Sequence, residues 1–196
     1  MNAIVLSGGI GTRMGGREKA FLKIGRDTFI SRKIRLLKPL FNKIIIVTNN
    51  PRLYRGLGVK IVKDREGGVG PLMGLYTGLK ASSAKYNFVT TSDTPFLKTE
   101  LVRYLIKNID DYDVVVPEWH GMIEPLCAVY SKKCIPYIKK VMDKNRRVNS
   151  FYKFSKVKFI SEHELKKIDL EGISFFNVNT SSDYEEALRK ETGEKR

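Results

Sequence analysis

The chain has 196 residues and a formal net charge of +15 at pH 7, and its 36 lysines and arginines are spread over the whole length. This size fits a single domain over residues 1–196, and neither a membrane-spanning apolar run nor a signal-like start is present, so we expect a cytoplasmic monomer without membrane contact. Because the cations form no single block and no RNA-binding aromatic signature accompanies them, the charge fits anionic small molecules or solubility as well as nucleic acid.

The first predicted element is a short buried strand over residues 3–6, and a glycine-rich loop follows it. This loop, residues 7–19, contains five glycines within nine residues. Glycine lets backbone N–H groups approach phosphate oxygens without a Cβ in the way, and Arg13 and Lys19 add full positive charge. We interpret Leu6, Ser7, Gly8 and Gly9 with Lys19 as a triphosphate cradle. The alternative is a glycine-rich surface turn with scattered charges.

Two known phosphate-binding patterns do not match this loop. The P-loop pattern fails because Lys19 is followed by Ala20, where that pattern needs serine or threonine. The dinucleotide fingerprint fails because Met14 stands at the place of its third glycine. The loop is therefore a cradle of another type.

Strands and helices alternate along the next hundred residues. The predicted elements are a helix over 31–40, strands over 43–48 and 59–62, a helix that follows a second glycine-rich stretch at 63–72, a strand over 87–91, a helix through 101–106 and a strand over 113–117. This alternation predicts an α/β fold with a doubly wound, mostly parallel, Rossmann-like sheet and helices on both faces. The last third adds strands over 127–130 and 157–160, a helix over 134–142 and a terminal helix with a capping box at 182–185.

Ligands of such sheets bind outside the carboxyl ends of the strands, which here gathers the loops 7–19, 49–50, 64–74 and 92–95. Asp93 ends a predicted strand on this edge, where a carboxylate can hold Mg²⁺ against substrate phosphates. Alternatively, Asp93 caps a helix that begins near Pro95. The phosphate cradle on the same edge favours the metal. Cys127 and Cys134 are not grouped with the histidines, so we expect two buried reduced thiols and no zinc site.

The loop L-S-G-G-x-G-x-R-M-G, with its closing lysine, resembles the signature of small nucleotidyltransferases, and most closely the MobA family of molybdenum cofactor guanylyltransferases. That family carries L-A-G-G-x-x-x-R-M-G-x-D-K, so Ser7 stands for the usual alanine and Glu18 for the usual aspartate. Further matches are G-P-L-x-G-L at 70–75, D-x-P-[FY] at 93–96, an x-P-L segment at 124–126 and an asparagine-rich stretch at 176–180.

The resemblance implies a nucleotidyltransferase-type fold that transfers GMP from GTP to the phosphate of the molybdopterin cofactor. The N-terminal half would bind the nucleotide and the C-terminal part the acceptor. The implied catalytic residues are Arg13, Lys19 and Asp93, with Asp93 as the Mg²⁺ ligand. The implied binding residues also include Asn49, Asp64, Gly70, Asn177 and Asn179.

Other interpretations of the same residues remain open. A related enzyme could use CTP or a sugar phosphate, and a nucleotide- or RNA-binding protein without turnover could share the loop. We expect GTP and the molybdopterin cofactor as partners, with transient contacts to proteins that deliver or accept the molybdenum cofactor, and no nucleic acid.

Overall fold

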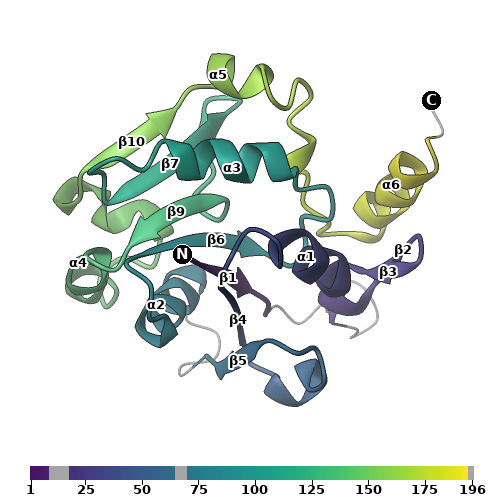
Figure 1. The fold of residues 1–196 in the computed structure, drawn as a ribbon, viewed down its shortest axis with the longest axis horizontal. Coiled ribbons are helices and arrows are strands. Elements are labelled where there is room, and N and C mark those ends of the chain that lie inside the picture. Colours follow the sequence, from purple (N-terminus) through teal and green to yellow (C-terminus); the bar gives the residue numbers. More distant parts are fainter. Residues whose placement is uncertain (9–17, 65–69, 194–196) are drawn as a thin grey trace.

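The computed structural model describes residues 1–8, 18–64 and 70–193. Its centre is one mixed sheet with helices on both faces (Figure 1). The strand order is β10-β7-β9-β6-β1-β4-β5, and β8 pairs with β7 beside this path. The bounds are β1 Asn2–Leu6, β4 Lys43–Thr48, β5 Lys60–Lys63, β6 Tyr86–Thr91, β7 Val114–Trp119, β8 Met122–Ile123, β9 Ala128–Ser131 and β10 Val157–Ile160.

The pairing directions place most strand ends on one edge. β1 is parallel to β4 and β6, β4 is parallel to β5, and β10 is parallel to β7. β9 is antiparallel to both β6 and β7, so β6 and β7 point the same way. The carboxyl ends of β1, β4, β5 and β6 therefore meet at one edge, as the predicted mostly parallel sheet requires.

Helices cover both faces of the sheet. One face packs against α1 (Phe29–Leu37), α3 (Thr99–Lys107) and α5 (Glu162–Lys166). The other packs against α2 (Pro71–Ala81), α4 (Cys134–Val141) and the 3₁₀ segment η4 (Val148–Phe154). The predicted doubly wound arrangement is thereby confirmed.

Smaller elements complete the described chain. A two-stranded hairpin of β2 (Lys23–Ile24) and β3 (Asp27–Thr28) packs with α6 (Ser181–Thr192) in a separate apolar cluster. Three short 3₁₀ turns are η2 (Lys19–Phe21), η3 (Pro51–Tyr54) and η5 (Ile173–Phe175). Of these, η2 and η3 flank the carboxyl edge of the sheet and carry residues of the site described below.

The central strand β1 shows why its sequence is apolar throughout. Ala3 and Val5 belong to the apolar cluster on one face and Ile4 to that on the other, and all three are fully buried because strand side chains alternate between faces. Helix α2 lies close over this strand: a Cβ at Gly78 would come within 2.5 Å of the Ile4 side chain. Only glycine at this position allows that approach.

Some predicted boundaries are wrong, and side-chain caps explain two of them. Helix α1 begins at Phe29 because Thr28 Oγ1 accepts from the Ser31 backbone N–H at 3.2 Å, and it ends at Leu37. The C-terminal capping box joins Thr180 to Asp183, two residues before the predicted one. The structure also contains β8, α5 and η4, which the sequence analysis did not predict.

Both cysteines are buried free thiols, as expected. Burial raises the pKa of Cys127 to about 12, so this thiol stays protonated. Within the described residues, no helix combines the length and the apolar character that crossing a membrane requires.

Candidate active site

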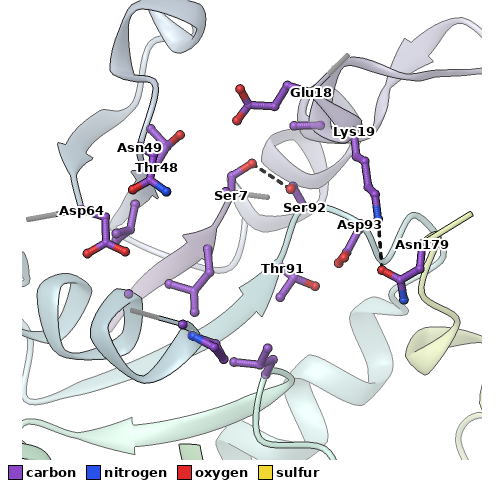
Figure 2. Close-up of a pocket in the computed structure, with 18 residues that line it drawn as sticks. Ser7, Glu18, Lys19, Thr48, Asn49, Asp64, Thr91, Ser92, Asp93 and Asn179 are labelled. Carbon is purple, nitrogen blue, oxygen red and sulfur yellow. Dashed lines mark hydrogen bonds between the residues drawn. The ribbon is translucent and has the colours of Figure 1, made fainter. Parts of the chain in front are cut away.

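A cavity of about 790 Å³ opens at the carboxyl edge of the sheet, between the ends of β1, β4 and β6 and the start of α2 (Figure 2). The predicted site residues that line it are Leu6, Ser7, Gly8, Lys19, Asn49, Asp64, Gly70, Asp93 and Asn179. In Figure 2, Lys19, Asp93 and Asn179 lie at one end of the cavity, and Asn49 and Asp64 lie at the other. The fold thus brings together residues that are far apart in the sequence, from Leu6 at the end of β1 to Asn179 just before α6.

Three predicted residues are not among those lining the cavity. Gly9 and Arg13 lie outside the described residues. Asn177 is exposed, and its side-chain amide donates to the Phe175 backbone carbonyl at 3.2 Å instead of reaching the cavity. Asn177 and Asn179 are both exposed and flank the fully buried Val178, and of these three residues Asn179 lines the cavity.

Lys19 and Asn179 form a direct link across the cavity wall. Lys19 Nζ donates to Asn179 Oδ1 at 3.1 Å, and the contact is exposed to solvent. The neighbouring Val178 is fully buried, and its backbone N–H donates to the Asp93 carbonyl at 2.9 Å. The segment before α6 therefore contacts both Lys19 and Asp93.

Asp93 has the environment of a cation ligand. Its Oδ1 is buried and has no hydrogen-bond partner among the described residues, which is costly for a carboxylate unless a ligand completes it. The alternative role as a helix cap is wrong, because α3 begins only at Thr99 and its N-cap residue is Lys98. No group of three or more His, Cys, Asp or Glu in the described part of the chain could hold a metal. One carboxylate completed by water and phosphate suits Mg²⁺.

A buried lysine that the sequence analysis missed supports the turn that carries Asp93. Lys33 Nζ donates to the Thr94 carbonyl at 2.6 Å, to Thr94 Oγ1 at 2.8 Å and to Thr90 Oγ1 at 3.5 Å. Burial lowers the pKa of Lys33 to about 8, although Cys127 and Asp93 nearby favour its charged form. The signal was present in the sequence: Lys33 lies between the buried residues Ile30 and Leu37 on one helical face.

A row of hydrogen bonds joins Ser7, Ser92 and Glu18, which line the cavity, to Tyr54, which is fully buried. Ser7 Oγ lies 2.7 Å from Ser92 Oγ and 2.7 Å from Tyr54 Oη, and the Tyr54 hydroxyl donates to Glu18 Oε1 at 2.6 Å. Asn50 Nδ2 donates to the other oxygen of Glu18 at 3.3 Å. Burial, helped by the Glu18 carboxylate, raises the pKa of Tyr54 above its usual range, so the hydroxyl keeps its proton. The sequence analysis placed the loops of Glu18 and Ser92 at this edge but gave neither residue a role, and it did not single out Tyr54.

The opposite end of the cavity is built on β5 and α2. The Asp64 backbone N–H donates to the Thr48 carbonyl at 2.9 Å, and Asp64 Oδ1 accepts from Thr77 Oγ1 at 3.3 Å. Gly70 has a φ of +91° and directly precedes Pro71, the first residue of α2, so the chain enters the helix through a conformation that favours glycine. Among the described residues that line this end, the polar groups include a carboxylate, an amide side chain and backbone groups, and there is no cation.

Glu124 lies two residues before Leu126, which lines the cavity. The Glu124 side chain is partly buried, and desolvation raises its pKa to about 7. The sequence analysis had singled out residues 124–126 by resemblance but could not foresee this shift.

Comparisons with known proteins indicate one family. The model of the family described as "MobA-like NTP transferase domain" matches residues 3–162. The chain is 36% identical over 193 residues to a probable molybdenum cofactor guanylyltransferase from Clostridium perfringens, with 96% of each chain covered. It is 36% identical to the molybdenum cofactor guanylyltransferase of Desulfosudis oleivorans, covering 95% of this chain and 94% of the relative.

A solved structure gives the same result at the level of the fold. The crystal structure of molybdopterin-guanine dinucleotide biosynthesis protein A from Archaeoglobus fulgidus superposes with a TM-score of 0.84 at 25% identity. The match covers 98% of this chain and all of that one.

Proposed function

Because the chain belongs to the MobA-like NTP transferase family, we propose that it is a molybdenum cofactor guanylyltransferase. It transfers GMP from GTP to the phosphate of the molybdenum–molybdopterin cofactor, and pyrophosphate leaves. The observation that supports this most directly is the cavity edge where Asp93, with an unpaired buried oxygen, lies at the same end as Lys19.

The reaction needs positioning and charge neutralisation, and it needs no protein nucleophile. The acceptor phosphate is an anion at neutral pH, so it can attack the α-phosphorus without a general base. The described chain supplies what remains, a pocket that holds two anionic substrates in line and groups that offset their charge.

Asp93 would hold the divalent cation, Mg²⁺, with its unpaired oxygen. Bound there, Mg²⁺ supplies Lewis acidity and a template for the phosphate oxygens. Lys19, held toward the cavity by Asn179, would contact the triphosphate and stabilise the departing pyrophosphate. Arg13 lies outside the described residues and keeps the predicted role of a second cation on the same phosphates.

We assign the guanine base to the end of the cavity that contains Asn49, Asp64 and Gly70. Guanine presents N1–H and N2–H₂ donors on one edge, and the Asp64 carboxylate with nearby backbone carbonyls can accept from them. The acceptor would approach from the side of Leu126 and Asn179. In this proposal residues 1–196 form one domain, in which the N-terminal half binds the nucleotide and the C-terminal part binds the acceptor. We propose that this domain works as a cytoplasmic monomer and meets cofactor delivery or acceptor proteins transiently.

The experiment supplies GTP, ATP or CTP with Mg²⁺ and a panel of phosphorylated acceptors, among them molybdopterin and a sugar 1-phosphate, and measures pyrophosphate release. We expect turnover only with molybdopterin and a preference for GTP of roughly two orders of magnitude in kcat/KM, because unpaired polar groups reject the wrong base. Equal use of CTP would contradict the guanylyltransferase assignment. Transfer to the sugar phosphate would contradict molybdopterin as the acceptor. RNA binding without turnover would contradict the assignment of the protein as an enzyme.

A base-reading role for Asp64 can be tested in the same assay. Asp64→Ala should reduce the GTP-to-CTP ratio more than it reduces turnover at saturating GTP. Asp27→Ala, which removes a carboxylate from a surface ion pair with Arg35, is the matched control and should leave the ratio unchanged. An unchanged ratio in Asp64→Ala would remove this residue from base recognition.

A further inference from the structure

Two residues that line the cavity are direct chain neighbours of the proposed functional groups. Ser92 precedes Asp93, and Glu18 precedes Lys19. Neither Ser92 nor Glu18 has a role in the transfer itself as proposed above. Both, however, belong to the hydrogen-bonded row that passes through Ser7 and Tyr54. A displacement at either end of this row would move a functional side chain.

The row joins four parts of the chain that are distant in sequence. Ser7 follows β1 and Ser92 follows β6, while Tyr54 ends η3 and Glu18 precedes η2. Its three links measure 2.7, 2.7 and 2.6 Å between oxygen atoms. These are short, well-formed hydrogen bonds.

The row is shielded from water at its centre. Tyr54 is fully buried and Ser7 is 1% exposed. The Tyr54 ring also packs against Phe21 of η2, with ring centroids 5.0 Å apart, and the Phe21 backbone N–H donates to the Glu18 carbonyl at 3.0 Å. Hydrogen bonds in such a low-dielectric setting hold geometry more firmly than exposed ones.

The other connection between Lys19 and Asp93 is weaker. It runs from Lys19 to Asn179 through an exposed contact, and from Val178 to the Asp93 carbonyl. An exposed hydrogen bond to a lysine competes with water and fixes distance poorly. The buried row is therefore the firmer of the two connections.

We propose that Ser7, Tyr54 and Glu18 act as one positioning unit that sets the separation between Asp93 and Lys19 across the cavity. This inference rests on the proposed function, since it assigns Asp93 to the metal and Lys19 to the phosphates. Tyr54 and Glu18 act through their neighbours and are positioning residues, and Ser7, which also belongs to the predicted triphosphate cradle, joins Tyr54 to Ser92. They set how well one triphosphate can contact both groups at once.

The test uses minimal changes in the row. Tyr54→Phe removes only the hydroxyl and keeps the ring packing, and Glu18→Asp keeps the charge beside Lys19 but shortens its reach. Ser7→Ala tests the far link if either variant folds poorly. Ser82→Ala is the matched control: Ser82 accepts from Asn2 at 2.9 Å and donates to Asn87, and it thus joins β1 and β6 at their opposite ends.

Each variant in the row should lower kcat about tenfold and change the KM for GTP by less than threefold, because binding survives while alignment is lost. The double variant Tyr54→Phe/Glu18→Asp should be no more than about twofold slower than the slower single variant, since both break one unit. Ser82→Ala should lower the melting temperature by a similar amount and leave kcat unchanged. Wild-type kcat in all row variants at a temperature where they are folded would overturn the proposal, and so would multiplicative effects in the double variant.

A binding measurement separates this proposal from the function on which it rests. Calorimetry gives the affinity for GTP with and without Mg²⁺. Mg²⁺ should tighten GTP binding in the wild type and in Ser82→Ala, and this gain should fall only about twofold in Tyr54→Phe, in line with the small change expected in KM. Absent turnover in the wild type, with this pattern intact, would contradict the transferase and keep the positioning unit. The same Mg²⁺ gain in Tyr54→Phe as in the wild type would overturn the positioning unit alone.

Discussion

The turn that carries Asp93 and the segment that carries Lys19 face the same cavity but are held in different ways. Ser92 and Thr94, on either side of Asp93, are both buried, and the turn is bonded by Ser7, by Lys33 and by the Val178 backbone. Lys19 is partly exposed and has one side-chain contact, to Asn179, in the described chain. Its neighbour Glu18 supplies the connection to the buried row.

This difference teaches where function and stability are coupled. Around Asp93 the same bonds that shape the site also hold β6, α1 and the C-terminal segment together, so changes there affect folding and activity at once. Around Lys19 the contact is exposed and contributes little to folding. Loss of the bonds from Ser7 or Lys33 to this turn should therefore reduce stability as well as activity, whereas Asp93 Oδ1, which has no partner among the described residues, and Lys19 can be changed with little loss of stability.

The largest effect should come from Asp93 itself. Asp93→Asn keeps the shape but weakens the ligand for the cation, and it should lower Mg²⁺-dependent kcat/KM by about 10³-fold. The melting temperature in metal-free buffer should not fall, because the variant removes a buried, unpaired carboxylate oxygen. Pyrophosphate release and scanning calorimetry measure the two quantities. A loss of stability with retained activity would make Asp93 structural.

Lys19→Ala tests the exposed segment in the same way. It should lower kcat/KM by about 10²-fold, or about 3 kcal/mol of transition-state stabilisation. The fold should be unaffected, since the lysine is bonded only to an exposed asparagine among the described residues. Lys23→Ala, an exposed lysine in β2, is the control and should behave as the wild type. Unchanged turnover in Lys19→Ala would exclude Lys19 from the mechanism.

Lys33 allows the buried region around Asp93 to be tested through the pH dependence of the free energy of unfolding. The folded protein has a Lys33 pKa of about 8, below the ordinary 10.5, so the unfolded chain binds more protons between these values. Stability from this group therefore rises with pH from about 8 to 10.5, by roughly 3 kcal/mol in total for a shift of this size. Urea unfolding of wild type and Lys33→Met at several pH values gives the difference. If the difference in unfolding free energy between the two proteins does not change between pH 8 and 10.5, burial of Lys33 does not lower its pKa.

The smallest effect is expected from Glu124, and it tests whether side chains on the proposed acceptor side of the cavity are also shielded from water. Desolvation raises the Glu124 pKa from 4.5 to about 7, so the folded protein holds this proton more tightly than the unfolded chain. Stability from Glu124 is present below pH 4.5 and lost as the pH rises to 7, by about 1 kcal/mol once solvent screening of this partly exposed group is included. Comparing Glu124→Gln with the wild type at pH 5 and pH 7.5 measures it. An equal difference at both pH values would place Glu124 in a water-like environment.

Much of the fold was readable from local patterns. The apolar runs at 3–6 and 43–48 correspond to β1 and β4, and the alternation of strands and helices predicted the doubly wound sheet. The edge rule then placed four loops together, and the cavity contains residues from each of them. These features are local or depend on general rules of chain connection, so one sequence carries them.

The partners of individual side chains were not readable in this way. Ser7 and Glu18 are the two departures from the family pattern, and nothing in the sequence links them, yet both contact Tyr54. Lys33 stood out from an apolar helical face, but its acceptors are on a turn some sixty residues later. Asn177 and Asn179 lie in the same asparagine-rich stretch, but their side chains bond different partners, the Phe175 carbonyl and Lys19.

The sequence by itself determined the periodicities, the glycine-rich turns and the residue types at the cavity edge, because these follow from sterics and burial within a few residues. The tertiary structure alone decided which polar groups meet. The order of strands in the sheet sets which loop ends become neighbours, and a hydrogen bond forms only where two such groups come within about 3 Å. Asp93 was visible as a carboxylate at a strand end, but the folded chain alone shows that its Oδ1 has no partner among the described residues and that α3 begins only at Thr99.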